Sequence, residues 1–234
     1  MARTGHLPSP GEALDSAQRG GRGTAVATSD GSSDGSNDGR GGSWTIEARE
    51  RLYEGFYRID RLRFRHALHG GGESGPIERE LFVRGDVVGV LPYDRARDRV
   101  LLVEQFRIGA MRRSPDPWLW EIVAGMIDTD ETPEAVARRE AREEAGLEIE
   151  RLELIARYLA SPGSTTEEIS LYLAECDLGG AGGRYGLVDE DEDILARVVP
   201  AERAFAMLDS GEICNALSII ALQWLRYRRM TGEA

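Results

Sequence analysis

Lysine is absent from this chain of 234 residues, and all 29 of its basic side chains are arginines. The absence excludes any mechanism that needs a lysine nucleophile or a lysine Schiff base. The two cysteines, Cys176 and Cys214, lie far apart without a CxxC partner, and only three histidines are present. We therefore expect neither a disulfide framework nor a zinc site, and the cysteine usage favours a reducing, cytoplasmic setting.

Long apolar runs are also missing. No stretch of eighteen apolar residues occurs and the N-terminus has no signal-peptide pattern, so we expect no membrane partner. The 41 acidic residues outnumber the basic ones and give a net charge of −12. Such a chain gains nothing from neutralising phosphates, so we expect no nucleic-acid partner. Residues 1–43 have hardly any large apolar side chains, which predicts a disordered Gly/Ser/Asp-rich tail.

From Trp44 onward the hydrophobic pattern is that of a folded domain. Alternation over 44–68 predicts two or three strands, and the apolar runs 87–94 and 99–108 predict a buried hairpin. Further strands are expected over 118–128, 152–161 and 168–176, and helices over 132–146, 200–211 and 215–229. The helix over 132–146 has Thr132 as a cap, Pro133 in its first turn and Gly146 at its end. Strands and helices mix without regular alternation, which predicts an α+β fold with helices packed on a mixed sheet.

Three carboxylates crowd one side of that expected helix. In RREAREEAG, residues 138–146, the spacing of Glu140, Glu143 and Glu144 puts them roughly on one face. Like charges at this spacing destabilise a helix by a few tenths of a kcal/mol per pair, roughly, unless something offsets them. Either arginines and water solvate the face, or a cation binds there. The segment alone favours the solvated face.

The residues around the cluster favour the cation instead. Gly125, Glu131 and the run from Arg139 to Leu147 follow the pattern GX5EX7REUXEEXGU without a departure, with Ala141 as the small aliphatic residue U. This pattern resembles the Nudix box, and the chain is identified as similar to the Nudix hydrolases. The resemblance implies a Nudix-type mixed sheet sandwiched by helices, preceded by an N-terminal antiparallel strand region. It also implies a loop–helix–loop that binds Mg²⁺ or Mn²⁺ on a substrate diphosphate.

The same resemblance implies roles for single residues. Glu140, Glu144 and the backbone carbonyl of Ala124 would be metal ligands, and Glu143 would be a further ligand or a partner of one. Arg139 would hold the glutamates in place. Hard divalent cations prefer such oxygen ligands, and Gly125 and Gly146 allow the backbone to turn sharply at the ends of the box.

Several stretches outside the box, among them LLVEQFRI, LWEIVAGMID and LASPGSTTE, resemble the Nudix subfamily that cleaves ADP-ribose. Pro162, fifteen residues beyond Leu147, occupies a position associated with that substrate. The resemblance implies that the substrate is bound by Phe56, Tyr57, Arg79, Arg107, Met126, Ser161 and Glu167. The two arginines would grip the diphosphate and terminal ribose, and the two aromatic residues would stack on adenine from a partner subunit. The structural alternatives are that the two arginines form salt bridges at strand edges and that the two aromatic residues belong to the hydrophobic core. Glu78 departs from the subfamily, many of whose members have a second arginine there.

A second acidic run, DEDEDI at 189–194, resembles the mobile loop that carries the catalytic base of the subfamily. By resemblance Glu190 is the proton acceptor and Glu192 binds an additional metal, with the choice of base open within 189–193. A solvated loop is the alternative. The subfamily forms a domain-swapped homodimer, so we expect residues 44–78 to exchange between subunits and 79–234 to form the Nudix domain.

These features predict Mg²⁺-dependent hydrolysis of ADP-ribose to AMP and ribose 5-phosphate. One alternative is the hydrolysis of another nucleoside diphosphate sugar, such as GDP-mannose. The other is a sensor that holds ADP-ribose without cleaving it.

Overall fold

The structure, a computed structural model, describes residues 43–112, 116–127, 131–186 and 191–232. Nearly all of the expected tail, and the candidate base Glu190, lie outside the described residues. The described chain divides into two compact units. The larger unit contains 51–62 and the chain from Glu78 onward, and the smaller contains 63–77 with the described residues up to Glu50.

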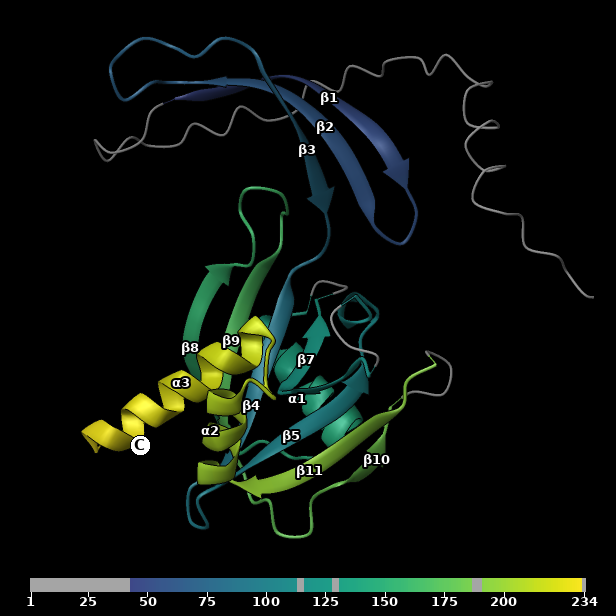
Figure 1. Cartoon of the computed structure of the whole chain (residues 1–234), viewed down its shortest axis with the longest axis vertical. Helices are drawn as coiled ribbons and strands as arrows, with labels where there is room; N and C mark the ends of the chain where they lie inside the picture. The colour runs from purple at the N-terminus through teal and green to yellow at the C-terminus, as the bar shows by residue number, and fades with distance from the viewer. Residues whose placement is uncertain (1–42, 113–115, 128–130, 187–190, 233–234) are drawn as a thin grey trace, which may run out of the picture. The chain divides into compact units, whose positions relative to one another are not determined.

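The N-terminal strands form a small antiparallel sheet (Figure 1). Its strands, in the order β1-β2-β3, are β1 (Trp44–Glu54), β2 (Arg58–His66) and β3 (Ile77–Val83). The alternating segment thus forms two strands, within the prediction, whereas β3 was not predicted. Every residue of β1 is exposed. Within the smaller unit, the carboxylate of Glu47 forms ion pairs with Arg63 (Nε–Oε2 2.9 Å) and with Arg65.

The larger unit is built on a mixed sheet of eight strands in the path β10-β11-β5-β4-β9-β8, with β6 paired to β5 and β7 to β4. β4 and β9 are parallel, and the other pairs are antiparallel. The strands are β4 (Val87–Asp94), β5 (Arg99–Phe106), β6 (Trp118–Glu121), β7 (Val123–Met126), β8 (Arg151–Leu159), β9 (Glu168–Glu175), β10 (Gly183–Tyr185) and β11 (Ile194–Pro200). The predicted hairpin is confirmed as β4 and β5, and β4 is buried along its whole length.

Helices cover both faces of this sheet (Figure 1). The helices are α1 (Pro133–Ala145), α2 (Ala201–Ser210) and α3 (Ala216–Thr231), with a 3₁₀ turn η1 (Ile108–Ala110). Alternate residues of β5 enter two separate cores: Leu101 and Val103 pack on the α1 side, and Val100 and Leu102 pack on the α2 and α3 side. This arrangement confirms the predicted α+β fold with helices packed on a mixed sheet. Among the described helices, none is long and apolar enough to cross a membrane.

One strand prediction is wrong in a way that matters for the site. The segment 118–128 was expected as a single strand, but it breaks at Ile122. Before the break β6 pairs with β5, and after it β7 pairs with β4. The break redirects the chain so that Ala124 and Gly125 face the last turns of α1.

Candidate active site

Local sequence signals fix where α1 begins and ends. The Thr132 side chain accepts a hydrogen bond from the backbone N–H of Ala135 (3.3 Å), and Pro133 occupies the first turn. Gly146 ends the helix in the left-handed conformation at φ 64°. The predicted helix and both of its ends are therefore confirmed. Glu140, Glu143 and Glu144 lie in its last two turns.

Glu144 is the most deeply buried carboxylate of the box, with only 4% of its surface exposed. Its Oε2 accepts a hydrogen bond from the backbone N–H of Ala124 (3.2 Å). Burial raises the pKa of Glu144 to about 8, and repulsion from Glu140 and Glu192 adds to the rise, against the Ala124 hydrogen bond and the charge of Arg107. Of the four residues predicted as metal ligands, Ala124 and Glu144 are joined by a hydrogen bond, and Glu140 and Glu192 are close enough to Glu144 for their charges to raise its pKa.

Glu140 lies against the backbone of Gly125, where a β-carbon would overlap its carboxylate. Only glycine leaves this space free, so the structure gives the first glycine of the box a packing reason. Gly125 lies inside β7, paired with Val88, and not at the sharp backbone turn that was expected there. Burial raises the pKa of Glu140 to about 7, opposed by Arg139 and reinforced by repulsion from Glu143 and Glu192. Two neighbouring carboxylates on α1 are therefore held in a site that resists negative charge.

Arg139 forms ion pairs with the box glutamates. Its Nη1 pairs with Glu140 Oε1 (2.9 Å) and Glu143 Oε2 (2.9 Å), and its Nε pairs with Glu131 Oε2 (3.3 Å). One guanidinium thus connects three of the acidic residues that the box specifies. Glu143 is more exposed than its neighbours and turns toward Arg139, which agrees with the role of a partner better than with that of a ligand.

The donor set suits a hard divalent cation. Carboxylate and backbone oxygens are the ligands that Mg²⁺ and Mn²⁺ prefer. A bound cation would favour the ionised carboxylates against the burial and the repulsion that raise both pKa values. Among the described residues, no group of three or more His, Cys, Asp or Glu side chains is already arranged to hold a metal ion. A complete site would therefore need backbone oxygens or waters as well, as is usual for Mg²⁺.

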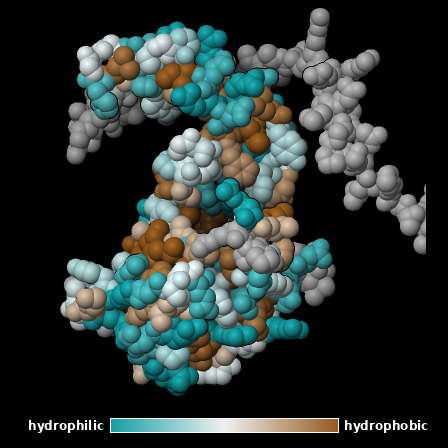
Figure 2. All heavy atoms as spheres, viewed as in Figure 1, coloured by the Kyte–Doolittle hydropathy of each residue, from teal (hydrophilic) through white to brown (hydrophobic). Residues whose placement is uncertain are grey.

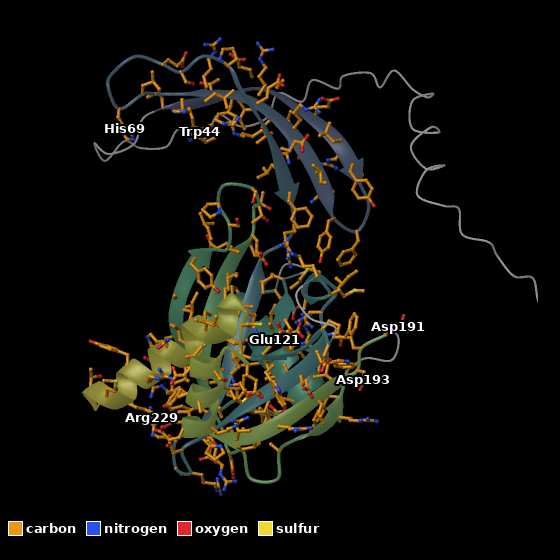
Figure 3. The ribbon with its side chains drawn as sticks, in the orientation of Figure 1. Trp44, His69, Glu121, Asp191, Asp193 and Arg229 are labelled. Atoms are coloured by element: carbon orange, nitrogen blue, oxygen red, sulfur yellow. The ribbon has the colours of Figure 1, made fainter. Side chains whose placement is uncertain are left out.

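The described part of the acidic run begins at Asp191 and leads into β11. Asp191 and Asp193 lie on the segment that leads into that strand (Figure 3). Glu192, between them, is close enough to Glu140 and Glu144 to raise their pKa values. Gly186, at φ 106°, approaches the backbone of Glu192 so closely that a β-carbon there would lie 2.7 Å from its carbonyl oxygen.

Arg107 is held by a buried acid that sequence reasoning missed. Its Nε pairs with Oε2 of Glu121 (2.7 Å), whose surface is only 9% exposed and which lies in the interior of the larger unit (Figure 3). Burial raises the pKa of Glu121, and Arg107 opposes that rise. The pair borders a pocket of about 380 Å³ that Leu119, Arg112 and Cys214 also line.

A second group surrounds Tyr57. The ring of Tyr57 lies 5.0 Å from that of Phe82, and the guanidinium of Arg84 lies 5.4 Å from its centroid. Nη2 of Arg84 pairs with Glu167 Oε1 (3.4 Å). Arg84 was not among the predicted residues, and its buried Nε is one of the few buried polar atoms in the described chain without a hydrogen-bond partner. Phe56 is 81% exposed.

Arg79, Met126 and Ser161 complete the predicted set. Arg79 is exposed on β3, and its Nη1 donates to the carbonyl of Glu78 (2.7 Å). Met126 ends β7, and Ser161 is exposed on the β8–β9 turn with its Oγ 3.3 Å from that of Ser164. Among the described residues, no hydrogen bond or ion pair joins Arg79 or Ser161 to the box.

Comparison with known proteins agrees with this geometry. The family model for the NUDIX domain matches residues 83–216, which include the whole box. The chain therefore belongs to the Nudix family.

Relatives within the family narrow the comparison. The chain is 50% identical over 181 residues to the ADP-ribose pyrophosphatase of Escherichia coli strain K12, covering 77% of this chain and 87% of that protein. It is 42% identical to the ADP-ribose pyrophosphatase of Haemophilus influenzae, covering 77% and 85%. A GDP-mannose pyrophosphatase of Enterobacter sp. is 36% identical, covering 66% and 81%. The fold is similar to a crystal structure of an ADP compounds hydrolase, with a TM-score of 0.62 at 18% identity over 82% of this chain and 97% of that one.

Proposed function

We propose that this protein hydrolyses the pyrophosphate of ADP-ribose to AMP and ribose 5-phosphate with the help of Mg²⁺. The observation that carries the proposal is the 50% identity to an ADP-ribose pyrophosphatase over 77% of the chain. The buried carboxylates that the box places between α1 and β7 support it, because they provide oxygen ligands where a substrate diphosphate could reach them.

Glu140, Glu144, Glu192 and the carbonyl of Ala124 would hold the divalent cation. When bound, Mg²⁺ or Mn²⁺ would neutralise the charge of the diphosphate and favour attack by water on phosphorus. Arg139 keeps Glu140 and Glu143 in fixed orientations, so that the ligands are preorganised before the cation arrives.

The chain's own groups account for the remaining steps. Glu121 anchors Arg107, whose positive charge also lowers the pKa of Glu144. The planar fork of Arg107 would bind diphosphate oxygens. Glu190 would take the proton from the attacking water. It belongs to the same acidic run as Glu192, whose carboxylate lies near the box.

The adenosine end of the substrate would be bound by the group around Tyr57. An aromatic ring and a guanidinium plane give stacking surfaces, and Glu167 offers an acceptor for hydroxyl or amino groups. Phe56 and Tyr57, supplied by a partner subunit, would stack on adenine, and Arg79 would grip the diphosphate and terminal ribose together with Arg107. Met126, Ser161 and Glu167 would line the same pocket, and Arg84 joins this predicted set.

We also propose a cytoplasmic homodimer with a tail over 1–43, exchanged strands over 44–78 and a Nudix domain over 79–234. The support is the surface of the three-stranded sheet, where Figure 2 shows a few hydrophobic side chains among mostly hydrophilic ones. The exposed side chains there include Trp44, Ile46, Leu52 and Tyr53. An edge strand of this length with apolar side chains is usually covered in the assembled protein. Light scattering should give twice the chain mass, and Ile46→Glu should shift it toward one chain.

GDP-mannose hydrolysis is the second candidate, because a GDP-mannose pyrophosphatase is 36% identical to this chain. Comparing kcat/KM across a panel of nucleoside diphosphate sugars separates the two. We expect the highest value with ADP-ribose, and a preference for GDP-mannose would replace the proposal.

The third candidate function is that of a sensor that binds ADP-ribose without cleaving it. It would need no complete metal site, whereas Glu140, Glu143 and Glu144 are all present. Phosphate release in a phosphatase-coupled assay with ADP-ribose and Mg²⁺ tests this directly. Binding of ADP-ribose without phosphate release would favour the sensor.

A further inference from the structure

The strand is interrupted between β6 and β7, and the backbone N–H of Ile122 has no partner in the sheet. β6 pairs with β5 as far as Glu121, and β7 pairs with β4 from Val123. Ile122, between them, belongs to neither ladder and is itself almost fully buried. A buried backbone N–H without a hydrogen bond is strongly unfavourable, so the N–H of Ile122 needs a hydrogen-bond acceptor from outside the sheet.

The C-terminal helix provides that acceptor. The N–H of Ile122 donates to Oγ of Ser218 (2.9 Å), in the first turn of α3, 96 residues further along the chain. Ser218 has no exposed surface at all. A polar side chain so deeply buried is retained where its hydrogen bond is needed.

Asn215 makes a second connection at the same place. Its Oδ1 caps α3 by accepting from the N–H of Ser218 (3.0 Å), while its Nδ2 donates to the carbonyl of Trp120 (2.9 Å). The first turn of α3 therefore holds the backbone on both sides of Glu121. The same chain is held from the other face of the sheet by α1, through the hydrogen bond from Ala124 to Glu144.

We propose that Ser218 and Asn215 are positioning residues for the metal site. By fixing Trp120 and Ile122 they fix Ala124, two residues further on, and with it the carbonyl assigned to the cation. The inference rests on the proposed function, because it concerns the same cation. If the hydrogen bond from Ile122 to Ser218 is lost, the N–H of Ile122 must find another acceptor. The backbone then shifts at Ile122, and this shift moves Ala124 relative to Glu140 and Glu144.

The alternative is that the two residues only stabilise α3, so the test must separate metal affinity from stability. Ser218→Ala removes the acceptor, and Ser218→Thr keeps it. Asn215→Asp keeps an oxygen to cap the helix but replaces the donor to Trp120. Leu225→Val, at a fully buried position of α3 away from the break, is the control for lost stability.

The measurement is Mn²⁺ binding to the purified full chain without nucleotide, by electron paramagnetic resonance, at a temperature where circular dichroism shows each variant folded. We expect Ser218→Ala and Asn215→Asp to bind Mn²⁺ about tenfold more weakly, the size typical of groups that orient metal ligands. The Mg²⁺ concentration for half-maximal ADP-ribose hydrolysis should rise by a similar factor. Leu225→Val should not change the affinity, and Ser218→Thr should recover most of it.

Wild-type affinity for Mn²⁺ in folded Ser218→Ala and Asn215→Asp would overturn the inference and leave the proposed function intact. An equal loss in Leu225→Val would also overturn it, because the effect would then follow stability alone. Wild-type protein that neither binds Mn²⁺ nor hydrolyses ADP-ribose would instead contradict the proposed function itself.

Discussion

The carboxylate of Glu140 occupies the space beside Gly125 that a β-carbon would fill. The first glycine of the box and the first glutamate of its metal set, fifteen positions apart in the sequence, are therefore a packed pair. This contact links the strand β7 to α1 at the point where the cation would bind.

Gly125→Ala should accordingly displace Glu140. We expect kcat for ADP-ribose to fall about 100-fold, the cost typical of moving a catalytic group by roughly an ångström. Gly75→Ala is a matched control, because nothing lies within 4 Å of a β-carbon at that position. Steady-state kinetics on both variants checks this, and a Gly125→Ala enzyme with wild-type kcat would show that Glu140 is not needed where it lies.

The raised pKa values predict how the metal-free protein responds to pH. In the folded chain burial raises the pKa values of Glu140 and Glu144 to about 7 and about 8, above the ordinary glutamate value of 4.5. The folded state therefore binds more protons than the unfolded state between these values. The stability from the protonated pair is fully present below about pH 4.5 and is lost as pH rises through 7 and 8.

Thermal unfolding of the chelated protein between pH 5 and pH 8 tests that sign. We expect the Tm to fall across this range, and added Mg²⁺ to restore it most strongly at pH 8. Carboxylates with lowered pKa values, such as Asp94 and Glu134, are ionised in both states above pH 5 and do not contribute to the change. A Tm that rises with pH in the absence of metal would contradict the assigned environment of the pair.

The buried partner of Arg107 should influence substrate binding. Glu121→Gln removes the charge that holds Arg107 in place, at a cost of about 1.5 kcal/mol for a hydrogen bond to a charged group. We expect the KM for ADP-ribose to rise about tenfold with a smaller change in kcat. Glu175→Gln, which breaks the distant pair with Arg95, is the control. An unchanged KM in Glu121→Gln would remove Arg107 from the proposed substrate contacts.

Two glycines of left-handed conformation offer a matched test of the acidic run. Gly180 and Gly186 have φ values of 82° and 106°, so alanine strains the backbone at both. Only at Gly186 would the β-carbon also meet Glu192, whereas nothing lies within 4 Å at Gly180. We expect Gly186→Ala to lower kcat roughly tenfold or more, and Gly180→Ala to affect mainly the Tm. Equal kcat values in the two variants would mean that the position of Glu192 is unimportant.

Local signals explain which parts of this structure could be predicted. The ends of α1 follow from Thr132, Pro133 and Gly146, whose effects depend on neighbours within a few residues. The hairpin of β4 and β5 follows from two apolar runs joined by a short polar turn. The carboxylate cluster could be predicted from the box because its three glutamates lie on one helix.

The features that were missed depend on distant partners or on misleading composition. β11 follows an acidic run and ends at Pro200, so its apolar residues were not separated from the loop before them or the helix after them. The break at Ile122 depends on Ser218, which no local pattern connects to it. Arg84 became a candidate only when the fold placed it between Tyr57 and Glu167.

We propose that the buried carboxylates of α1 hold a divalent cation for the cleavage of ADP-ribose. Glu144→Gln keeps the size of the side chain and removes its charge, so the fold should survive. The test is to measure AMP release from ADP-ribose at saturating Mg²⁺ for this variant and for the wild-type protein. We predict rapid release by the wild-type protein, none after chelation, and a fall in kcat by orders of magnitude in Glu144→Gln. Wild-type turnover in the variant, or release that continues in the chelator, would contradict the account.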